Sequence, residues 1–211
     1  MQELNRIELE SQRLETLVDE VLGLLHESSG AQQLQIQRFD LAEMLQDLVE
    51  IVNYESPEET GQISLQAPSQ LYLDGDREQL WRAFENLLRN ALVHSGDPGS
   101  IDVNAGFSVD SAARSGEISI SVKDSGSGIA EMHLARIFDP FYRVDEARTR
   151  RTGGRYDGHG LGLAIAASAV RRHGGSISAS NRRSGGLAVS VVLPTTAPSR
   201  STSLSQKSEL H

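Results

Sequence analysis

The chain has 211 residues and no cysteine, so disulfide bonds and metal sites with thiolate ligands are excluded. Aromatic residues make up only 5% of it, and no apolar run approaches the length of a membrane span. The N-terminus also lacks the pattern of a signal peptide. We therefore expect the chain as given to be soluble and cytoplasmic, without a membrane segment.

Lysine is scarce, since it occurs only at Lys123 and Lys207, and arginine supplies almost all of the positive charge. The formal net charge of −9 argues against binding to nucleic acid through overall charge. The length suffices for a substantial core, in one large domain or in a domain with a small appendage.

One helix is predicted around the stretch from Leu80 to Ala91. Its apolar residues have helical spacing and form one buried stripe: Leu80, Phe84, Leu87, Leu88 and Ala91. Asn86 and Asn90 are four residues apart, so their amides share a face beside that stripe. Amide oxygens are hard, neutral ligands that can hold a hydrated metal ion and its phosphates. The alternative is that both are solvated helix positions.

A second helix is predicted over residues 4–25, where apolar residues form two interleaved rows at spacings of three and four: Leu4, Ile7, Leu14, Val18, Val21 and Leu25. A helix of this length cannot bury such a stripe alone, so we expect a partner helix, which a second chain could supply. Packing on its own domain is the alternative.

The remaining elements alternate between short strands and helices. We predict strands at 33–39, 63–65, 71–73, 101–107, 117–122, 176–179 and 187–193, and helices at 40–52, 131–137 and 161–173. The strands at 101–107 and 117–122 should form a hairpin in an antiparallel sheet. The fold class is therefore α+β, a two-layer sandwich, followed from 195 by a disordered tail.

Two glycine motifs suggest a ligand. The stretch from Asp124 to Ile129 follows a strand, where Gly126 and Gly128 would let a flat ligand approach the backbone and Asp124 could accept a hydrogen bond from an exocyclic amine. The stretch from Gly158 to Ala164 precedes a helix, whose first N–H groups and dipole suit a phosphate. A plain turn and glycines for close packing are the respective alternatives.

A long polar segment lies between these motifs and carries Arg148, Arg150, Arg151 and Arg155. Such a loop inside a compact domain is typical of a lid, and arginine on it would suit closure over a polyphosphate. Phe138 and Phe141 are expected to anchor its hinge in the core. A solvated charged loop is the alternative.

Four stretches in this order resemble the N, G1, F and G2 boxes of sensor histidine kinases, whose fold is shared with Hsp90, MutL and gyrase. The stretches are Phe84–Ala91, Asp124–Gly128, Phe138–Phe141 and Gly158–Gly162. The chain looks most like the Cpx-type envelope-stress sensor kinases. The resemblance implies a Bergerat-type ATP-binding fold and phosphoryl transfer from Mg·ATP to a histidine.

The resemblance also implies roles for individual residues. Asn90 would bind Mg²⁺, Asn86 would lie near the phosphates or metal, and Asp124 would read the adenine amino group. The rest of the nucleotide site would comprise Gly126, Gly128, Ile129, Phe138, Gly158, Gly160, Leu161 and Gly162. Arg143 or Arg148 would contact the γ-phosphate.

By the same resemblance, residues 1–30 are the second helix of a dimerisation bundle, 31–194 the catalytic domain and 195–211 the tail. None of the six histidines has the context of the phosphoacceptor, so the fragment is not expected to phosphorylate itself. The expected partners are ATP, a response regulator and a second copy through the bundle. The parent is expected to be an inner-membrane sensor kinase.

Three other functions share parts of this pattern. A gyrase-type or Hsp90-type ATP hydrolase would carry a general-base glutamate four residues before the metal asparagine, where Asn86 stands, while Glu85 lies about 100° round the helix. A degenerate module could bind nucleotide or a partner without turnover. A serine kinase of the anti-sigma-factor type would not need the helix at 4–25.

Overall fold

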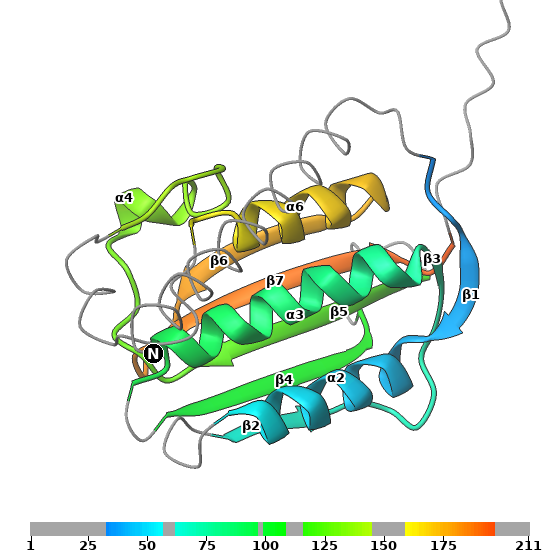
Figure 1. The fold of residues 1–211 in the computed structure, drawn as a ribbon, viewed down its shortest axis with the longest axis horizontal. Coiled ribbons are helices and arrows are strands. Elements are labelled where there is room, and N and C mark those ends of the chain that lie inside the picture. Colours follow the sequence, from blue (N-terminus) through cyan, green and yellow to red (C-terminus); the bar gives the residue numbers. More distant parts are fainter. Residues whose placement is uncertain (1–32, 57–61, 97–98, 109–115, 145–158, 197–211) are drawn as a thin grey trace, which may run out of the picture.

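The structure is a computed structural model that describes residues 33–56, 62–96, 99–108, 116–144 and 159–196 (Figure 1). The predicted helix at 4–25, most of the predicted tail, the arginines of the predicted lid and Gly158 lie outside the described residues.

A five-stranded sheet forms one layer. Its strands lie in the order β2 (Gln62–Gln66), β4 (Ser100–Phe107), β5 (Glu117–Asp124), β7 (Leu187–Pro194) and β6 (Ser176–Asn181). The expected hairpin of β4 and β5 is confirmed. The prediction of an antiparallel sheet was wrong at one edge, because β2 pairs with β4 in parallel. A helix lies between these two strands in the chain and returns it to the same end of the sheet.

The helical layer covers one face of this sheet (Figure 1). It consists of α2 (Leu41–Glu55), α3 (Arg77–His94) and α6 (Gly162–Arg172). Strand β5 shows why the helices cover only one face of the sheet. Its residues Ile118, Ile120 and Val122 are buried, while the residues between them, which point to the other face, are partly exposed. The predicted two-layer α+β sandwich is confirmed, with its core between the layers.

The predicted apolar stripe of α3 is confirmed, because all five of its residues are buried in the core. Helix α6 buries a different surface, made of small side chains: Ala164, Ala166, Ala167, Ala169 and Val170. Small residues let a helix approach its neighbours closely, and α6 packs against α3. This packing brings two sequence motifs together.

Several predicted boundaries differ from the observed ones. The strand predicted at 33–39 is β1 (Gln37–Asp40), which pairs with β3 (Tyr72–Gly75) in a separate small sheet. The Asp40 carboxylate caps α2 by accepting from the Ala42 N–H, and α2 runs three residues beyond the predicted end, to Glu55. The helix predicted at 131–137 is only α4 (Glu131–Leu134).

A buried polar contact joins the start of α3 to the end of α6. His173 is 3% exposed, its Nε2 accepts from the Asp76 N–H at 2.9 Å, and its Nδ1 lies 2.7 Å from the Ala169 carbonyl. Burial lowers the pKa of His173 below its usual value, because the charged form loses its hydration. The two helices are therefore fixed antiparallel at this end by a neutral imidazole.

Candidate functional site

The N-terminus of α6 meets the middle of α3 at Asn86. A Cβ added to Gly162 would lie 2.8 Å from Asn86 Oδ1, so the glycine allows this close approach. The Asn86 amide donates to the Arg82 carbonyl at 3.0 Å. Its oxygen is thus turned toward the first residue of α6.

In the part of the chain that the structure describes, no side chain caps the first turn of α6. The residue at the cap position, Leu161, is fully buried, and no acidic residue lies in the first turn. Gly160 precedes it with φ of +76°, a conformation that favours glycine. The first N–H groups of a helix have no partner within the helix, so this end can bind an anion.

Asn90 lies one turn beyond Asn86 on the same face of α3 and is half-buried. Within the described residues its side-chain amide has no hydrogen-bond partner. No group of three His, Asp or Glu side chains in the described part of the chain could hold a metal ion. A cation at Asn90 would therefore take its other ligands from water and from a bound phosphate, which is how Mg²⁺ commonly binds.

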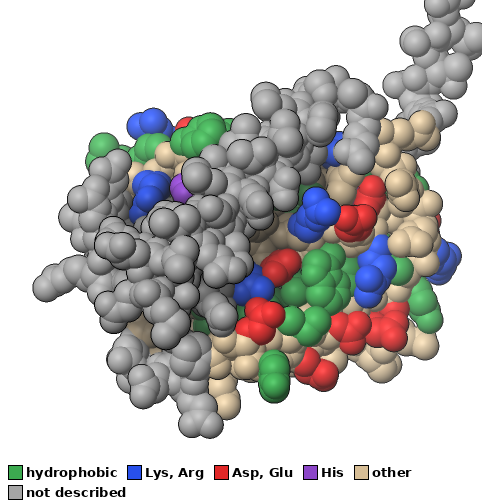
Figure 2. Space-filling view, viewed as in Figure 1, with side chains coloured by type: hydrophobic (Ala, Val, Ile, Leu, Met, Phe, Trp, Pro, Cys, Tyr) green, Lys and Arg blue, Asp and Glu red, His purple; other side chains and the backbone are tan. Residues whose placement is uncertain are grey.

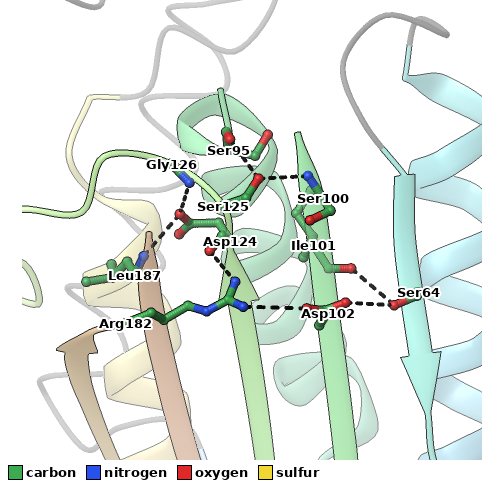
Figure 3. A network of polar contacts seen from close by, with 10 residues as sticks. All are labelled: Ser64, Ser95, Ser100, Ile101, Asp102, Asp124, Ser125, Gly126, Arg182 and Leu187. Atoms are coloured by element: carbon green, nitrogen blue, oxygen red, sulfur yellow. Dashed lines mark hydrogen bonds and ion pairs between the residues drawn. The ribbon is translucent and has the colours of Figure 1, made fainter. Parts of the chain in front are cut away.

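The carboxylate of Asp124 lies at the end of β5 and is nearly buried, at 4% exposure. One oxygen, Oδ1, accepts from the N–H of Gly126 at 2.8 Å and from that of Leu187 at 3.1 Å (Figure 3). The other oxygen has no partner among the described residues. A buried carboxylate oxygen is costly unless a donor meets it, so this oxygen is suited to a ligand N–H.

The loop after Asp124 is held close to α3 and β6. A Cβ on Gly126 would lie 1.9 Å from the His94 carbonyl oxygen, so only glycine fits there. Gly128 has φ of +67°. The Asn181 amide accepts from the Ile129 N–H at 3.0 Å and donates to the Ile129 carbonyl at 2.6 Å. This two-way contact fixes the loop at the edge of the sheet.

The aromatic motif that precedes the predicted lid behaves only partly as expected. Phe138 is buried in the core at 9% exposure, but Phe141 is 61% exposed, so the prediction that it anchors a hinge in the core was wrong. Its backbone turns outward with φ of +64°, and its N–H donates to the Gly160 carbonyl at 2.9 Å. The side chain of Arg143 also packs beside Gly160.

The candidate site extends along the second half of α3, from the start of α6 to the loop after Asp124. Asn86 faces the start of α6, and His94, eight residues later, contacts Gly126 beside Asp124. Eight helical residues span roughly 12 Å, and Asn90 lies between the two ends. Uncapped N–H groups at one end and a carboxylate with a free oxygen at the other suit an anionic, elongated ligand that carries an amine.

Three contributors to this site are missing from the sequence prediction: Asn181, Arg182 and the N–H of Leu187. All three belong to β6, β7 or the turn between them, and they contact Asp124 or Ile129 across more than 50 residues of sequence. The only local signal is a polar, glycine-containing turn between two strands, which does not reveal such a contact.

The fold is one helical layer over a mixed five-stranded sheet, and a nearly buried carboxylate and the start of a helix lie at the two ends of its central helix. Residues 75–197 match the family described as histidine kinase-, DNA gyrase B- and HSP90-like ATPases. The chain belongs to this family, as the catalytic ATP-binding domain of the sensor histidine kinases of two-component systems.

Two curated relatives are similar over most of the chain. It is 38% identical to the sensor protein VanS of Enterococcus faecium over 167 residues. These residues cover 79% of this chain and 41% of VanS. It is 32% identical over 193 residues to the sensor histidine kinase CpxA of Escherichia coli K12, covering 91% of this chain and 39% of CpxA. The chain thus spans about two fifths of the length of each.

A solved structure is similar as well. Full-length ShkA in complex with AMPPNP is 25% identical, with a TM-score of 0.71 over 89% of this chain and 37% of that one. In the described part of this chain, no helix combines the length and the apolar character that crossing a membrane requires.

Proposed function

We propose that this domain binds Mg·ATP along the second half of α3 and transfers the γ-phosphoryl group to a histidine of a dimerisation helix, for relay to an aspartate of a response regulator. The bond from the γ-phosphorus to the β,γ-bridging oxygen breaks, a bond to an imidazole nitrogen forms, and ADP leaves. Such a transfer depends on positioning and charge neutralisation more than on covalent catalysis by the protein.

The observation that carries the proposal is the Asp124 carboxylate. It is nearly buried, one oxygen is held by two main-chain N–H groups, and the other has no protein partner within the described residues. An adenine presents an exocyclic amine that would donate to this free oxygen. Gly126, Gly128, Ile129 and Phe138 would line the base pocket.

The other end of the site would hold the phosphates. The uncapped N–H groups at the start of α6, with Gly158, Gly160, Leu161 and Gly162, suit the polyphosphate. Asn86 would contact the phosphates or the metal, and Asn90, as the proposed metal ligand, would help to place Mg²⁺, which neutralises phosphate charge when bound. Arg143 or Arg148 would stabilise the γ-phosphate, because guanidinium groups match its oxygens.

The contacts of Glu85 disfavour the alternative of an ATP hydrolase. Acidic and basic side chains are interleaved on the exposed surface of α2 and α3 (Figure 2). There, the Glu85 carboxylate pairs with Arg89 at 2.8 Å, and Arg89 also pairs with Glu55 of α2. Glu85 thus faces α2, whereas Asn86 faces α6, so Glu85 is not placed to activate a water beside a phosphate.

The partners of the whole protein follow from the same proposal. Residues 1–30 would supply one helix of a dimerisation bundle, 31–194 the catalytic domain and 195–211 a tail. The domain would work in the cytoplasm, as part of an inner-membrane sensor kinase that dimerises and contacts a response-regulator receiver domain.

The first test is calorimetric titration of AMPPNP with Mg²⁺. We expect binding by the wild type and a loss of roughly 100-fold in Asp124→Ala, because the pocket would lose the group that it uses to bind the amine. Asp47→Ala is the matched control, since Asp47 is a half-exposed carboxylate on α2. Equal affinities in all three proteins would refute the assignment of Asp124, and no binding by the wild type would refute the whole proposal.

A second experiment separates a kinase from a module that only binds nucleotide. The domain is mixed with [γ-³²P]ATP and a separately purified dimerisation domain that carries the phosphoacceptor histidine. We expect acid-labile label on that domain and none when its histidine is replaced. Nucleotide binding without transfer to any such domain would favour the binding module.

A further inference from the structure

The turn between β6 and β7 contacts the main chain of Asp124, and the role proposed for the Asp124 carboxylate does not explain this contact. Arg182 Nη1 donates to the main-chain carbonyl of Asp124 at 2.6 Å (Figure 3). The turn is closed by two backbone hydrogen bonds, from Arg182 N–H to the Gly186 carbonyl and from Gly185 N–H to the Arg182 carbonyl. Arg182 therefore extends from a turn of defined shape.

Arg182 acts where the ladder between β5 and β7 ends. The last pair in register is Lys123 with Ala188, and the next would be Asp124 with Leu187. At that point the Leu187 N–H donates to the Asp124 carboxylate. The Asp124 carbonyl faces Gly186, where an added Cβ would lie 2.0 Å from its oxygen, and Arg182 supplies its donor. Carboxylate and carbonyl of one residue are thus held by the same turn.

The Arg182 guanidinium also lies near a carboxylate on β4. Its Nη2 lies 3.8 Å from Oδ2 of Asp102 on β4, and Asp102 Oδ1 accepts from the Ser64 hydroxyl at 3.2 Å (Figure 3). The Arg182 side chain is 24% exposed and that of Asp102 47%, so the ion pair contributes little free energy. The guanidinium thus lies between the Asp124 carbonyl and the Asp102 carboxylate, and its hydrogen bond to the carbonyl is the contact that bears on Asp124.

We propose that Arg182 is a positioning residue for base selectivity. This rests on the proposed function, in which the free oxygen of Asp124 accepts from the adenine amine. Guanine carries a carbonyl oxygen at the corresponding position, which repels a carboxylate. A carboxylate held in place rejects guanine, whereas one whose main chain shifts can turn away from it. Arg182 thus controls the preference for adenine without touching the nucleotide.

The test measures the ratio of affinities for two nucleotides. Calorimetry with Mg²⁺ is run with AMPPNP and GMPPNP on the wild type, Arg182→Ala, Arg182→Lys and Arg183→Ala. Arg183 is the matched control, because it is the exposed next residue of the same turn and its loss changes the charge equally.

We expect Arg182→Ala to weaken AMPPNP roughly tenfold and GMPPNP hardly at all, since one charge-assisted hydrogen bond is lost. Arg182→Lys keeps a charged donor and should recover part of the preference for AMPPNP over GMPPNP. Arg183→Ala should have the same ratio of affinities as the wild type. Should Arg182→Ala fail to fold, Asp102→Asn, which leaves Arg182 in place, should lower the ratio by a smaller factor.

Three results would overturn the proposal. An unchanged ratio in Arg182→Ala would show that Asp124 is positioned without Arg182. A parallel loss of both nucleotides would show that the turn has only a structural role. Failure of the wild type to bind AMPPNP would reject the proposed function itself, and is distinguished from the other two because it precedes any variant.

Discussion

Helices α3 and α6 begin in different ways. At the start of α3 the Asp76 carboxylate accepts from the N–H groups of Gln79 and Gln35, at 3.1 and 3.0 Å, and the Asp76 N–H donates to His173. At the start of α6 no side chain of the described residues caps the helix. Every helix start has N–H groups without helical partners. At the start of α3 the cap residue Asp76 also joins distant parts of the fold, and at the start of α6 the proposed function assigns these N–H groups to a phosphate.

The largest effect is expected from removing the capped start. Asp76→Ala should lower the free energy of unfolding by about 2 kcal/mol, since it removes the cap of α3 and leaves the partly buried N–H groups of Gln35 and Gln79 without their acceptor. Urea unfolding measures this change. At temperatures where the variant is folded, AMPPNP affinity should be close to that of the wild type. A large loss of affinity in the folded variant would show that the two helix starts are not independent.

At the start of α6 a substitution should instead lower nucleotide affinity and leave stability nearly unchanged. Gly162→Ala places a Cβ against Asn86, so we expect AMPPNP affinity to fall about tenfold, equal to about 1.4 kcal/mol, with little change in stability. Calorimetry and thermal unfolding measure the two quantities. In the Asn86→Ala background, Gly162→Ala should lower AMPPNP affinity by less than it does in the wild type, because the amide that the new Cβ would meet is absent. Additive losses would argue against this contact as the cause.

The stability that the contacts at the start of α3 provide should also depend on pH, through His173. Burial lowers the pKa of His173 below its usual 6.5 in the folded state, although its contact with the Ala169 carbonyl and nearby Asp76 favour the charged form. The unfolded chain therefore binds this proton more readily, so stability should be complete above pH 6.5 and fall below it.

The loss should be at most about 1.4 kcal/mol per pH unit for this one group. Urea unfolding from pH 7.5 to 5 measures it, and His173→Gln is the control, because it keeps every other titrating group. An equal pH slope in both proteins would show that His173 does not govern this end of the molecule.

The smallest effect concerns an exposed carboxylate in the first turn of α3. Glu78 pairs with Arg82 at 2.6 Å, and both side chains are largely exposed. Glu78→Gln should destabilise the protein by only about 0.3 kcal/mol, because solvent screens such pairs. Chemical unfolding in parallel with Asp76→Ala makes the comparison. A loss as large as that of Asp76→Ala would mean that charge near the helix start, and not the cap, stabilises α3.

Local features made much of the fold predictable. The apolar stripe of α3 marks its buried face, and Asp40 marks the start of α2, because both depend on residues within a few turns. The prediction that Phe141 is buried was wrong for the opposite reason. An aromatic side chain favours burial on average, but the backbone of Phe141 pairs with Gly160 and turns the ring outward.

The candidate site divides in the same way. Asp124, Gly126 and Gly128 can be found from the sequence, because residues close along the chain shape the loop that they form. The contact of Arg182 with Asp124 crosses 58 residues, and a polar turn of the same composition could lie anywhere on the surface. The parallel pairing of β2 with β4 also cannot be predicted from the residues of the two strands, because it depends on the path of the chain through α3.

The sequence by itself determined which segments become helices and strands, and which glycines and polar side chains could meet a nucleotide, because spacing, caps and turn chemistry act over a few residues. Only the tertiary structure decided that the end of β5 is held by the turn between β6 and β7, and that Asn86 meets the start of α6. Such contacts arise when the apolar faces of separate elements pack together, and packing is a property of the whole core.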